Sequence, residues 1–295
     1  MNKDINNLAK KVISFSHQLY EENPIPLHRP VFEGNEKVFL AECIDTNFVS
    51  SVGKRVDEFE EKIASFTGSK YAVATVNGTS ALHIALMLLG VKEKTEVITQ
   101  SLTFVATCNS ISYLNAVPTF VDVDKDTMGM SPSALELFLK QNTTLKKGVL
   151  FNKKSNRKIS ACLPMHSYGY PCRIKEIKKI CKDWGIPLLE DCAESIGSFI
   201  DKKHSGNFGV AGTLSFNGNK LITTGGGGMI ITNNKKLACA AKHMTTTAKV
   251  PHPYNFIHNK IGYNYRLPNI NAALGCAQIE KIEFFLSQKR VLNNS

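Results

Sequence analysis

A lysine among small polar residues is the first side chain here that can carry chemistry. Lys220 ends the run Ser215–Lys220, and four glycines follow at Gly225–Gly228. A lysine amine that is desolvated and loses its proton can form a Schiff base with an aldehyde. Most lysines are solvated surface charges, however, and no Gly-Lys-Ser/Thr closes the glycine run into a Walker A loop. The position alone leaves a nucleophile and a surface charge both open.

An acidic cluster follows an apolar run further upstream. Leu188-Leu189 lead into Glu190-Asp191, and Glu194 follows three residues later. Ligands of open α/β sheets bind at the carboxyl ends of the strands. Asp191 can hold a positive charge of a ligand at this edge, or it can cap the next helix. The spacing does not decide between these interpretations.

A third segment, Val76–Leu82, lies where a predicted strand passes into a predicted helix. A helix N-terminus offers free N–H groups and the positive end of a dipole, which suit a phosphate. Gly78 lets the backbone approach a ligand, and Thr79 adds a hydroxyl. Asn77, Thr79 and Ser80 are also ordinary capping residues, so a plain helix cap remains the alternative. Taken together, these groups are the ones that pyridoxal phosphate (PLP) requires: a turn for its phosphate, Asp191 for its ring nitrogen and Lys220 for its aldehyde.

The elements that must position these residues alternate between strands and helices. Apolar runs predict strands at 71–75, 96–99, 119–123, 158–164 and 186–190. Amphipathic segments predict helices at 79–89, 105–114, 132–140 and 174–184. This order predicts an α/β fold with a mostly parallel sheet and helices on both faces. Further strands at 213–216 and 229–232, around glycine-rich turns, indicate that the sheet is mixed.

The remaining segments predict a helix within residues 1–20, a loop at 246–262 and one long helix from 270 to about 288. Because the Asn23-Pro24 step ends the first helix, we expect an N-terminal helical segment at 1–24. A large domain at 25–288 and a short tail at 289–295 would follow.

Composition narrows the class of protein. The 295 residues are 43% hydrophobic and carry a formal charge of +11, spread along the chain. This balance excludes a disordered chain, and no apolar run reaches the roughly 20 residues of a membrane span. Without a basic tail, nucleic acid is not expected as a partner. The start lacks a signal peptide, and the eight cysteines form no CxxC pair, so we expect a cytoplasmic protein without a metal site.

The motifs resemble the DegT/DnrJ family of nucleotide-sugar aminotransferases, which are PLP enzymes of fold type I. The matching stretches follow in family order along the sequence: IPLHRP (25–30), NFVSSVGKRVDEFE (47–60), NGTSALHIAL (77–86), LTFVATCNSI (102–111), PTFVDVD (118–124), MHSYGYPCRI (165–174), LLEDCAESIGS (188–198), SFNGNKLITTGGGGMI (215–230) and IGYNYRLPNINAALGCAQ (261–278). Relatives continue into a smaller C-terminal domain, which we expect to be absent or truncated here.

The resemblance implies a role for each matching residue. Lys220 would form the Schiff base with PLP and move the proton during turnover, and Asp191 would pair with the pyridinium nitrogen. Glu194 falls near the cofactor's ring oxygen, where many relatives have Gln or His. Phe104 would stack on the ring, with core packing as its alternative. 

The phosphate has its own set of implied ligands. Thr79 and Ser215 match phosphate ligands, and Gly78 would allow the close approach. Asn264 would reach the phosphate of a second copy, which implies a homodimer. His166 is expected to be structural, as a hydrogen-bonded core histidine.

The resemblance also narrows the substrate. SSVGKRVDEFE (50–60) and SFNGNKLITTGGGGM (215–229) look most like enzymes that aminate UDP-4-keto-6-deoxy-N-acetylhexosamines with glutamate as the amino donor. The alternatives are GDP-4-keto-6-deoxymannose, which gives perosamine, or a truncated and inactive PLP-fold protein. A sugar-dehydratase branch of the family has His in place of the lysine, and Lys220 argues against that branch.

Overall fold

A computed structural model describes residues 3–26 and 28–294. Residues 1, 2, 27 and 295, which belong to the expected N-terminal segment, the first family motif and the expected tail, lie outside the described residues. The chain divides into two compact units, residues 1–31 and 32–295. The first contains α1 (Lys3–Tyr20), a helix whose apolar residues recur every three or four positions and are exposed. The second unit carries all the candidate site residues.

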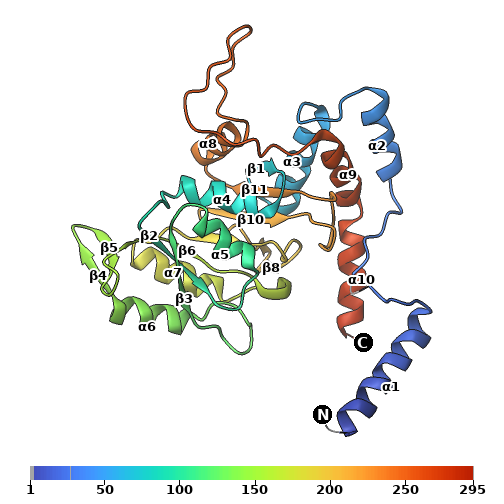
Figure 1. Ribbon diagram of the computed structural model, residues 1–295, viewed down its shortest axis with the longest axis horizontal. Helices are drawn as coiled ribbons and strands as arrows, with labels where there is room; N and C mark the ends of the chain where they lie inside the picture. Colours follow the sequence, from blue (N-terminus) through green and yellow to red (C-terminus); the bar gives the residue numbers. More distant parts are fainter. Residues whose placement is uncertain (1–2, 27, 295) are drawn as a thin grey trace. The chain divides into compact units, whose positions relative to one another are not determined.

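The second unit is built on a mixed sheet (Figure 1). Its strands are β1 (Tyr71–Thr75), β11 (Gly228–Thr232), β10 (Ala211–Ser215), β7 (Leu189–Asp191), β6 (Lys158–Leu163), β2 (Thr95–Gln100) and β3 (Val117–Val121), in this spatial order. Hydrogen bonds from the N–H of Cys162 to Pro187 O and from the N–H of Asp191 to Pro164 O join β6 to β7, each at 2.9 Å. Only β11 runs antiparallel to its neighbours in this row. The predicted mixed and mostly parallel sheet is confirmed.

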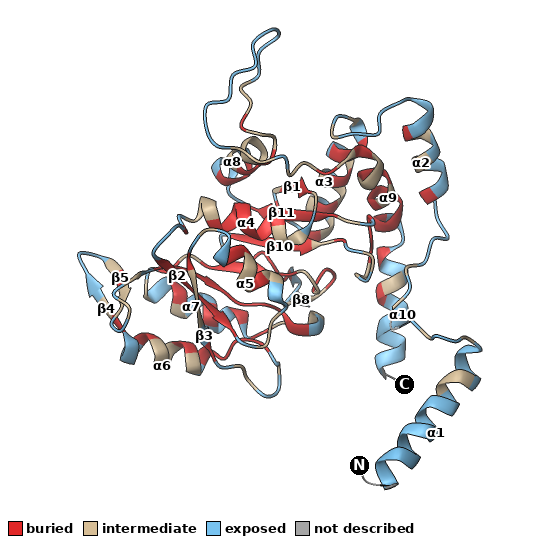
Figure 2. Ribbon diagram, viewed as in Figure 1, coloured by how far each residue is buried: buried red, intermediate tan, exposed pale blue. Residues whose placement is uncertain are grey.

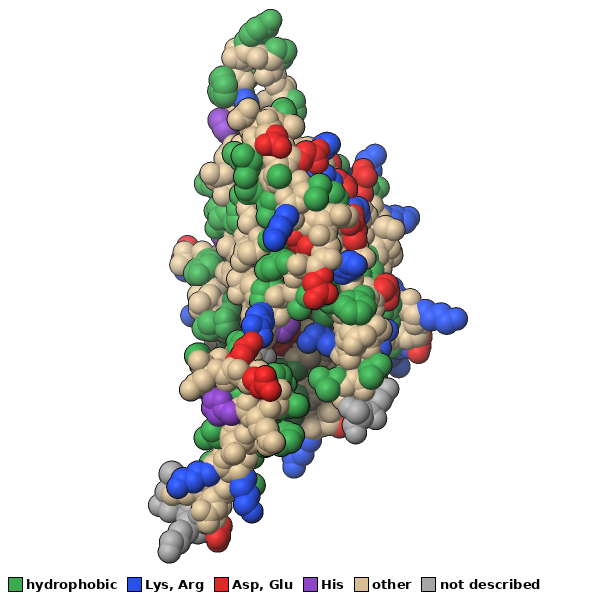
Figure 3. Space-filling model, turned by 90° about the vertical axis from the view of Figure 1, so that its right-hand side faces the viewer, with side chains coloured by type: hydrophobic (Ala, Val, Ile, Leu, Met, Phe, Trp, Pro, Cys, Tyr) green, Lys and Arg blue, Asp and Glu red, His purple; other side chains and the backbone are tan. Residues whose placement is uncertain are grey.

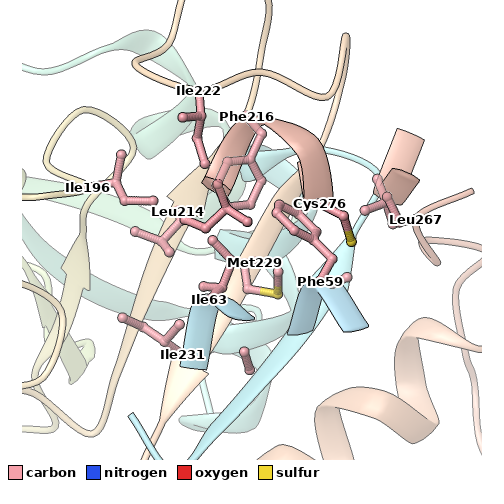
Figure 4. Close-up of a cluster of buried hydrophobic side chains, with 14 of the residues drawn as sticks. Phe59, Ile63, Ile196, Leu214, Phe216, Ile222, Met229, Ile231, Leu267 and Cys276 are labelled. Carbon is pink, nitrogen blue, oxygen red and sulfur yellow. The ribbon is translucent and has the colours of Figure 1, made fainter. Parts of the chain in front are cut away.

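Helices cover both faces of the sheet. They are α2 (Glu36–Asp45), α3 (Lys54–Thr67), α4 (Gly78–Leu88), α5 (Val105–Ser112), α6 (Pro132–Asn142), α7 (Ile174–Asp183), α8 (Lys235–Thr245), α9 (Asn269–Glu280) and α10 (Ile282–Asn294). Successive strand residues point to opposite faces. Met229 and Ile231 of β11 accordingly pack in one core with Phe59 of α3 (Figure 4), whereas Ile230 packs in another core with Leu82 of α4. Figure 2 shows β1, β10, β11 and much of α9 buried between these layers.

The prediction of one helix from 270 to about 288 is wrong. The first helix, α9, ends at Glu280, Lys281 has φ −103° and ψ 2°, and α10 starts at Ile282. No glycine or proline marks this break in the sequence. The second helix lays Ile282 and Leu286 on the core of α3 and α9, where Leu286 covers Gly197 so closely that a Cβ on the glycine would lie 2.5 Å from Leu286 Cδ2. Tertiary packing therefore overrides a continuous helical pattern.

Several strands and helices were not predicted. Strands β4 (Thr143–Lys146) and β5 (Val149–Asn152) form a hairpin through Lys147-Gly148, whose φ values are 50° and 76°. Two positive φ angles are typical of the tight hairpin turn that matches strand twist. The others are β8 (Phe199–Ile200), β9 (Lys203–His204), the short 3-10 helix η1 (Ser167–Gly169), α2, α3 and α8. The predicted loop at 246–262 is confirmed, with only isolated bridges such as Lys249–His258.

One face of the molecule shows how its charged side chains are distributed. On the face drawn in Figure 3, basic and acidic side chains are interspersed. None of the described helices combines the length and the apolar character that a bilayer crossing requires.

Candidate active site

The carboxyl ends of β1, β7 and β10 border a pocket of about 340 Å³ at the N-termini of α4 and α5. Its lining contains these predicted site residues: Gly78, Thr79, Phe104, Asp191, Glu194, Ser215 and Lys220. The eighth predicted residue, Asn264, does not line the pocket within the described part of the chain. It is exposed after α8 and pairs through its backbone with Thr246.

Strand order brings these distant segments together. The strands β1, β7 and β10 point the same way, so their carboxyl ends meet at one edge of the sheet. Between β1 and β10, the antiparallel β11 begins at Gly228, which lies against the turn before α4. A Cβ on Gly228 would collide with Asn77 O and with the N of Gly78. The last glycine of the run therefore lets the β11 strand pass beside this turn.

The turn before α4 contains a helix cap and, in the residues that the structure describes, leaves two N–H groups free. The side chain of Asn77 accepts the N–H of Ser80 at 2.8 Å. The N–H groups of Gly78 and Thr79 have no acceptor among the described residues. A Cβ on Gly78 would lie 3.0 Å from Ser215 Cβ, so glycine lets the hydroxyl of Ser215 lie beside the helix start. Free N–H groups, hydroxyls and the helix dipole suit a phosphate.

The carboxylate of Asp191 lines the pocket and is buried, and its oxygens can accept a further hydrogen bond. Thr107 Oγ1 donates to Oδ2 at 2.7 Å, and the N–H of Ala193 donates to Oδ1 at 3.1 Å. Burial raises the pKa of Asp191, and these two hydrogen bonds oppose the rise. A carboxylate can accept about four hydrogen bonds, so Asp191 can accept another donor, such as a protonated ring nitrogen. Thr107 lies in the family motif at 102–111, but its partner was not predicted.

The amine of Lys220 is held inside the pocket by a carboxylate. Its Nζ lies 3.3 Å from Glu194 Oε1, and only 16% of its side chain is exposed. The other oxygen of Glu194 accepts the N–H of Tyr168 at 2.9 Å. Glu194, predicted beside a ring oxygen, thus contacts the lysine directly. This ion pair was not predicted from the sequence.

The aromatic ring of Phe104 is available to a ligand. It stands just before α5 and is 66% exposed, although it lines the pocket. The core-packing alternative for Phe104 is therefore wrong. An exposed ring beside a pocket offers a flat face on which another ring can stack.

Behind Asp191, a second acid is fully engaged by the protein. Glu190 accepts the N–H groups of Gly206, Phe208 and Gly209 at 2.9, 2.7 and 2.6 Å. His166 is buried, as predicted for a core histidine, with Nε2 3.2 Å from Glu190 Oε2. 

The same histidine is occupied at its other nitrogen. Nδ1 of His166 accepts the N–H of Cys172 at 3.2 Å, so the ring proton lies on Nε2 and is donated to Glu190. Among the described residues, His166, Glu190 and Cys192 form a cluster of side chains that could bind a metal ion. Its nitrogen and oxygen ligand atoms already have hydrogen-bond partners, which indicates a structural role.

The residues of the pocket fit PLP. One cavity is bordered by the free N–H groups at the start of α4, a buried carboxylate that can accept another hydrogen bond, an exposed aromatic ring and a mostly buried lysine. These are the groups that a phosphate, a pyridine nitrogen, a ring face and an aldehyde require.

Comparisons with known proteins identify the family of the chain. The model of the DegT/DnrJ/EryC1/StrS aminotransferase family matches residues 32–294. EpsN of Bacillus subtilis (strain 168), which carries a provisional name as a pyridoxal phosphate-dependent aminotransferase, is 41% identical over 271 residues, or 91% of this chain and 66% of EpsN. The GDP-perosamine synthase of Escherichia coli O157:H7 is 41% identical over 266 residues, or 90% of this chain and 68% of that protein.

Among solved structures, PseC of Helicobacter pylori, an aminotransferase involved in the biosynthesis of pseudoaminic acid, matches with a TM-score of 0.77 and 27% identity, over 88% of this chain and 66% of PseC. The chain thus spans about two thirds of the length of the relatives it matches. The match of the family model over nearly the whole second unit, together with the 41% identities, shows that the chain belongs to the DegT/DnrJ/EryC1/StrS aminotransferase family.

Proposed function

We propose that this chain forms the cofactor-binding part of a PLP-dependent aminotransferase that transfers an amino group from glutamate to a nucleotide-linked 4-keto-6-deoxy sugar. The observation that carries the proposal is the single pocket that joins Lys220, Asp191 and the start of α4. Family membership supports the same reaction class.

Five residues that line the pocket would bind the cofactor without a covalent bond. The N–H groups of Gly78 and Thr79, with the hydroxyls of Thr79 and Ser215, would bind the phosphate. Phe104 would stack on the ring, and Asp191 would accept a hydrogen bond from the ring nitrogen. When bound, PLP withdraws electrons from the carbon atom that carries the amino group. The buried Asp191 carboxylate strengthens this effect by keeping a positive charge on the nitrogen.

Lys220 would act twice in the reaction. Its Nζ holds the cofactor covalently at rest and, once released, accepts the Cα proton of the amino donor. Glu194 Oε1, 3.3 Å away, would stabilise the resulting ammonium group. The mostly buried position of the lysine limits access of water to this proton.

The exposed Asn264 supports the proposal of a homodimer. Outside the pocket of its own chain, this side chain is free to reach the phosphate site of a second copy. Mixing inactive Lys220→Ala chains with inactive Asn264→Ala chains tests this. Shared sites would restore about a quarter of the parental activity after random exchange of equal amounts, since about half of the dimers are mixed and each mixed dimer keeps one of its two sites intact. No restoration in a dimer confirmed by sedimentation would contradict the shared site.

Two sugar substrates remain in the proposal. The sequence motifs favour UDP-4-keto-6-deoxy-N-acetylhexosamine, whereas the names of several relatives favour GDP-4-keto-6-deoxymannose as the precursor of perosamine. Such nucleotide sugars would place the reaction in the cytoplasm. The decisive assay incubates the purified protein with PLP, glutamate and each keto sugar, and measures amino-sugar product by mass.

The Lys220→Ala variant is the control for this assay. If product forms from just one of the two sugars, that sugar is the substrate. PLP binding without product from either sugar would support the alternative of a catalytically inactive PLP-binding protein.

A further inference from the structure

The turn that carries Lys220 has little regular structure of its own. It spans residues 216–227, between β10 and β11. Within it, the N–H of Lys220 donates to Asn217 O at 3.0 Å, and the N–H of Thr224 donates to Phe216 O at 2.9 Å. Asn217 and Asn219, on either side of Gly218, are exposed. These local bonds shape the turn, but they do not fix its position relative to Asp191 on β7.

Phe216 and Ile222 anchor the turn in the core, and helix α9 adds polar contacts to its backbone. Asn271 Nδ2 donates to Thr224 O at 2.7 Å, and Gln278 Oε1 accepts the N–H of Thr223 at 3.4 Å. Between them, Gly275 lies so close to the turn that a Cβ there would be 2.8 Å from Thr224 Cγ2. Residues four and then three positions apart share one face of a helix. Asn271, Gly275 and Gln278 therefore form one stripe against the turn, which we call the α9 stripe.

The far end of the α9 stripe is anchored to another element. Gln278 Nε2 donates to Glu36 Oε1 at 2.8 Å, and the N–H of Gly34 donates to Glu36 Oε2 at 2.8 Å. Both side chains are buried. Because the amide nitrogen faces Glu36, the amide oxygen must face Thr223. Glu36 at the start of α2 thus orients the group that holds the lysine turn.

From these contacts we infer that the α9 stripe positions Lys220. The inference rests on the proposed function, because it gives the lysine a cofactor to meet. None of the three stripe residues lines the pocket, so they are positioning residues that act through the backbone of Thr223 and Thr224. A Cβ at position 275 would also lie 2.7 Å from the ring of Phe59, so core packing itself requires the glycine, but core packing needs no amide at the other two positions. The stripe also explains why the family motif at 261–278, far from Lys220 in sequence, accompanies the site.

The test compares Asn271→Ala and Gln278→Met with Ile177→Ala, a control that destabilises a different core cluster. The first readout is amide hydrogen exchange of the segment 216–225 without PLP. We expect exchange at Thr223 and Thr224 to be about tenfold faster in the stripe variants and unchanged in the control. The second readout is borohydride trapping of PLP on Lys220, which we expect to need about tenfold more PLP in the stripe variants.

Parental exchange and trapping in both stripe variants would overturn the inference, and so would equal effects in Ile177→Ala at matched stability. A rescue separates positioning from folding. Gln278→Glu alone places two carboxylates together. Glu36→Gln combined with Gln278→Glu reverses the donor and the acceptor of the hydrogen bond between positions 36 and 278, and the new carboxylate still accepts the N–H of Thr223. We expect the double variant to restore both readouts. Failure of PLP to be trapped on Lys220 in the parent would sink the proposed function, while hydrogen exchange would still decide the role of the stripe.

Discussion

Two neighbouring carboxylates, Glu190 and Asp191, lie on opposite sides of the same strand and differ in their partners. Both are buried, with exposed fractions of 0% and 2%. Glu190 accepts three backbone N–H groups from the loop at 206–209 and the Nε2–H of His166. Asp191 accepts only the hydroxyl of Thr107 and one backbone N–H, and it lines the pocket.

The number of donors separates a structural acid from a candidate functional one. Burial acts on both groups in the same direction. Hydrogen bonds from His166 and from the backbone of the 206–209 loop nevertheless hold the pKa of Glu190 below its usual value, whereas the pKa of Asp191 is raised. A saturated carboxylate has no capacity left for a ligand, but one with two donors can accept a cationic N–H. Burial alone would not have told these residues apart.

The largest expected effect comes from Lys220, which lines the same pocket as Asp191. Lys220→Ala should abolish amino transfer and the trapping of PLP by borohydride, because no other described amine lines the pocket. Lys220→Arg is the matched control, since it keeps a cation beside Glu194 but cannot form a Schiff base. It should be equally inactive. Trapping of PLP on a different lysine, detected by peptide mass mapping, would remove Lys220 from its role.

The next effect separates the two acids by activity. Asp191→Asn should lower the rate of amino transfer by about 10²-fold or more, because an amide cannot stabilise a protonated ring nitrogen as a carboxylate does. PLP should still bind through the proposed phosphate site at the start of α4. Steady-state kinetics with saturating PLP measure the effect. Near-parental activity would show that Asp191 only stabilises the turn after β7, where it accepts the N–H of Ala193 and where none of the described helices begins that it could cap.

The free energy of unfolding should depend more on Glu190 than on Asp191, which is the reverse of the order expected for activity. Glu190→Gln should lower the free energy of unfolding by about 3 kcal/mol, because its NH₂ group must face backbone N–H donors in a buried site. Asp191→Asn should change it by about 1 kcal/mol or less, since only one N–H donor is affected. Urea unfolding of the cofactor-free variants measures both. If Asp191→Asn were the more destabilising change, donor number would not explain the difference.

The smallest effect is the pH dependence of these stabilities, and its sign differs between the acids. Because the pKa of Asp191 is raised on folding, the contribution of this group to stability is fully present below about pH 3.8 and is lost as the pH rises through the folded-state value, and Asp191→Asn lacks this contribution. The stability of Asp191→Asn relative to the parent should therefore increase with pH in this range and then level off.

The pKa of Glu190 is lowered, so its contribution is fully present above about 4.5 and is lost as the pH falls through the folded-state value. The deficit of Glu190→Gln should therefore shrink in acid. Each effect is on the order of 1 kcal/mol for one pKa unit. Urea titrations between pH 3 and 6 would show the two opposite slopes, and slopes of the same sign would contradict the assignment.

Local pattern in the sequence was enough for the sheet and for the segments that border the site. Alternating apolar strands and amphipathic helices predicted the mostly parallel sheet, because burial of each element's apolar face depends on its own residues. The turn at Asn77–Thr79, the acid Asp191 and the lysine Lys220 were likewise visible as strand ends and turns. The family resemblance gave them roles that spacing alone had left open.

Tertiary structure decided which groups meet. Three contacts join residues that are far apart in sequence: the ion pair of Lys220 with Glu194, the hydrogen bond of Thr107 to Asp191, and the contacts of the α9 stripe with the lysine turn. Such contacts depend on the strand order β1-β11-β10-β7 and on helix docking, neither of which is encoded in a local period. For the same reason, the break at Lys281 and the exposed ring of Phe104 could not be read from residue type, since packing against distant elements sets both.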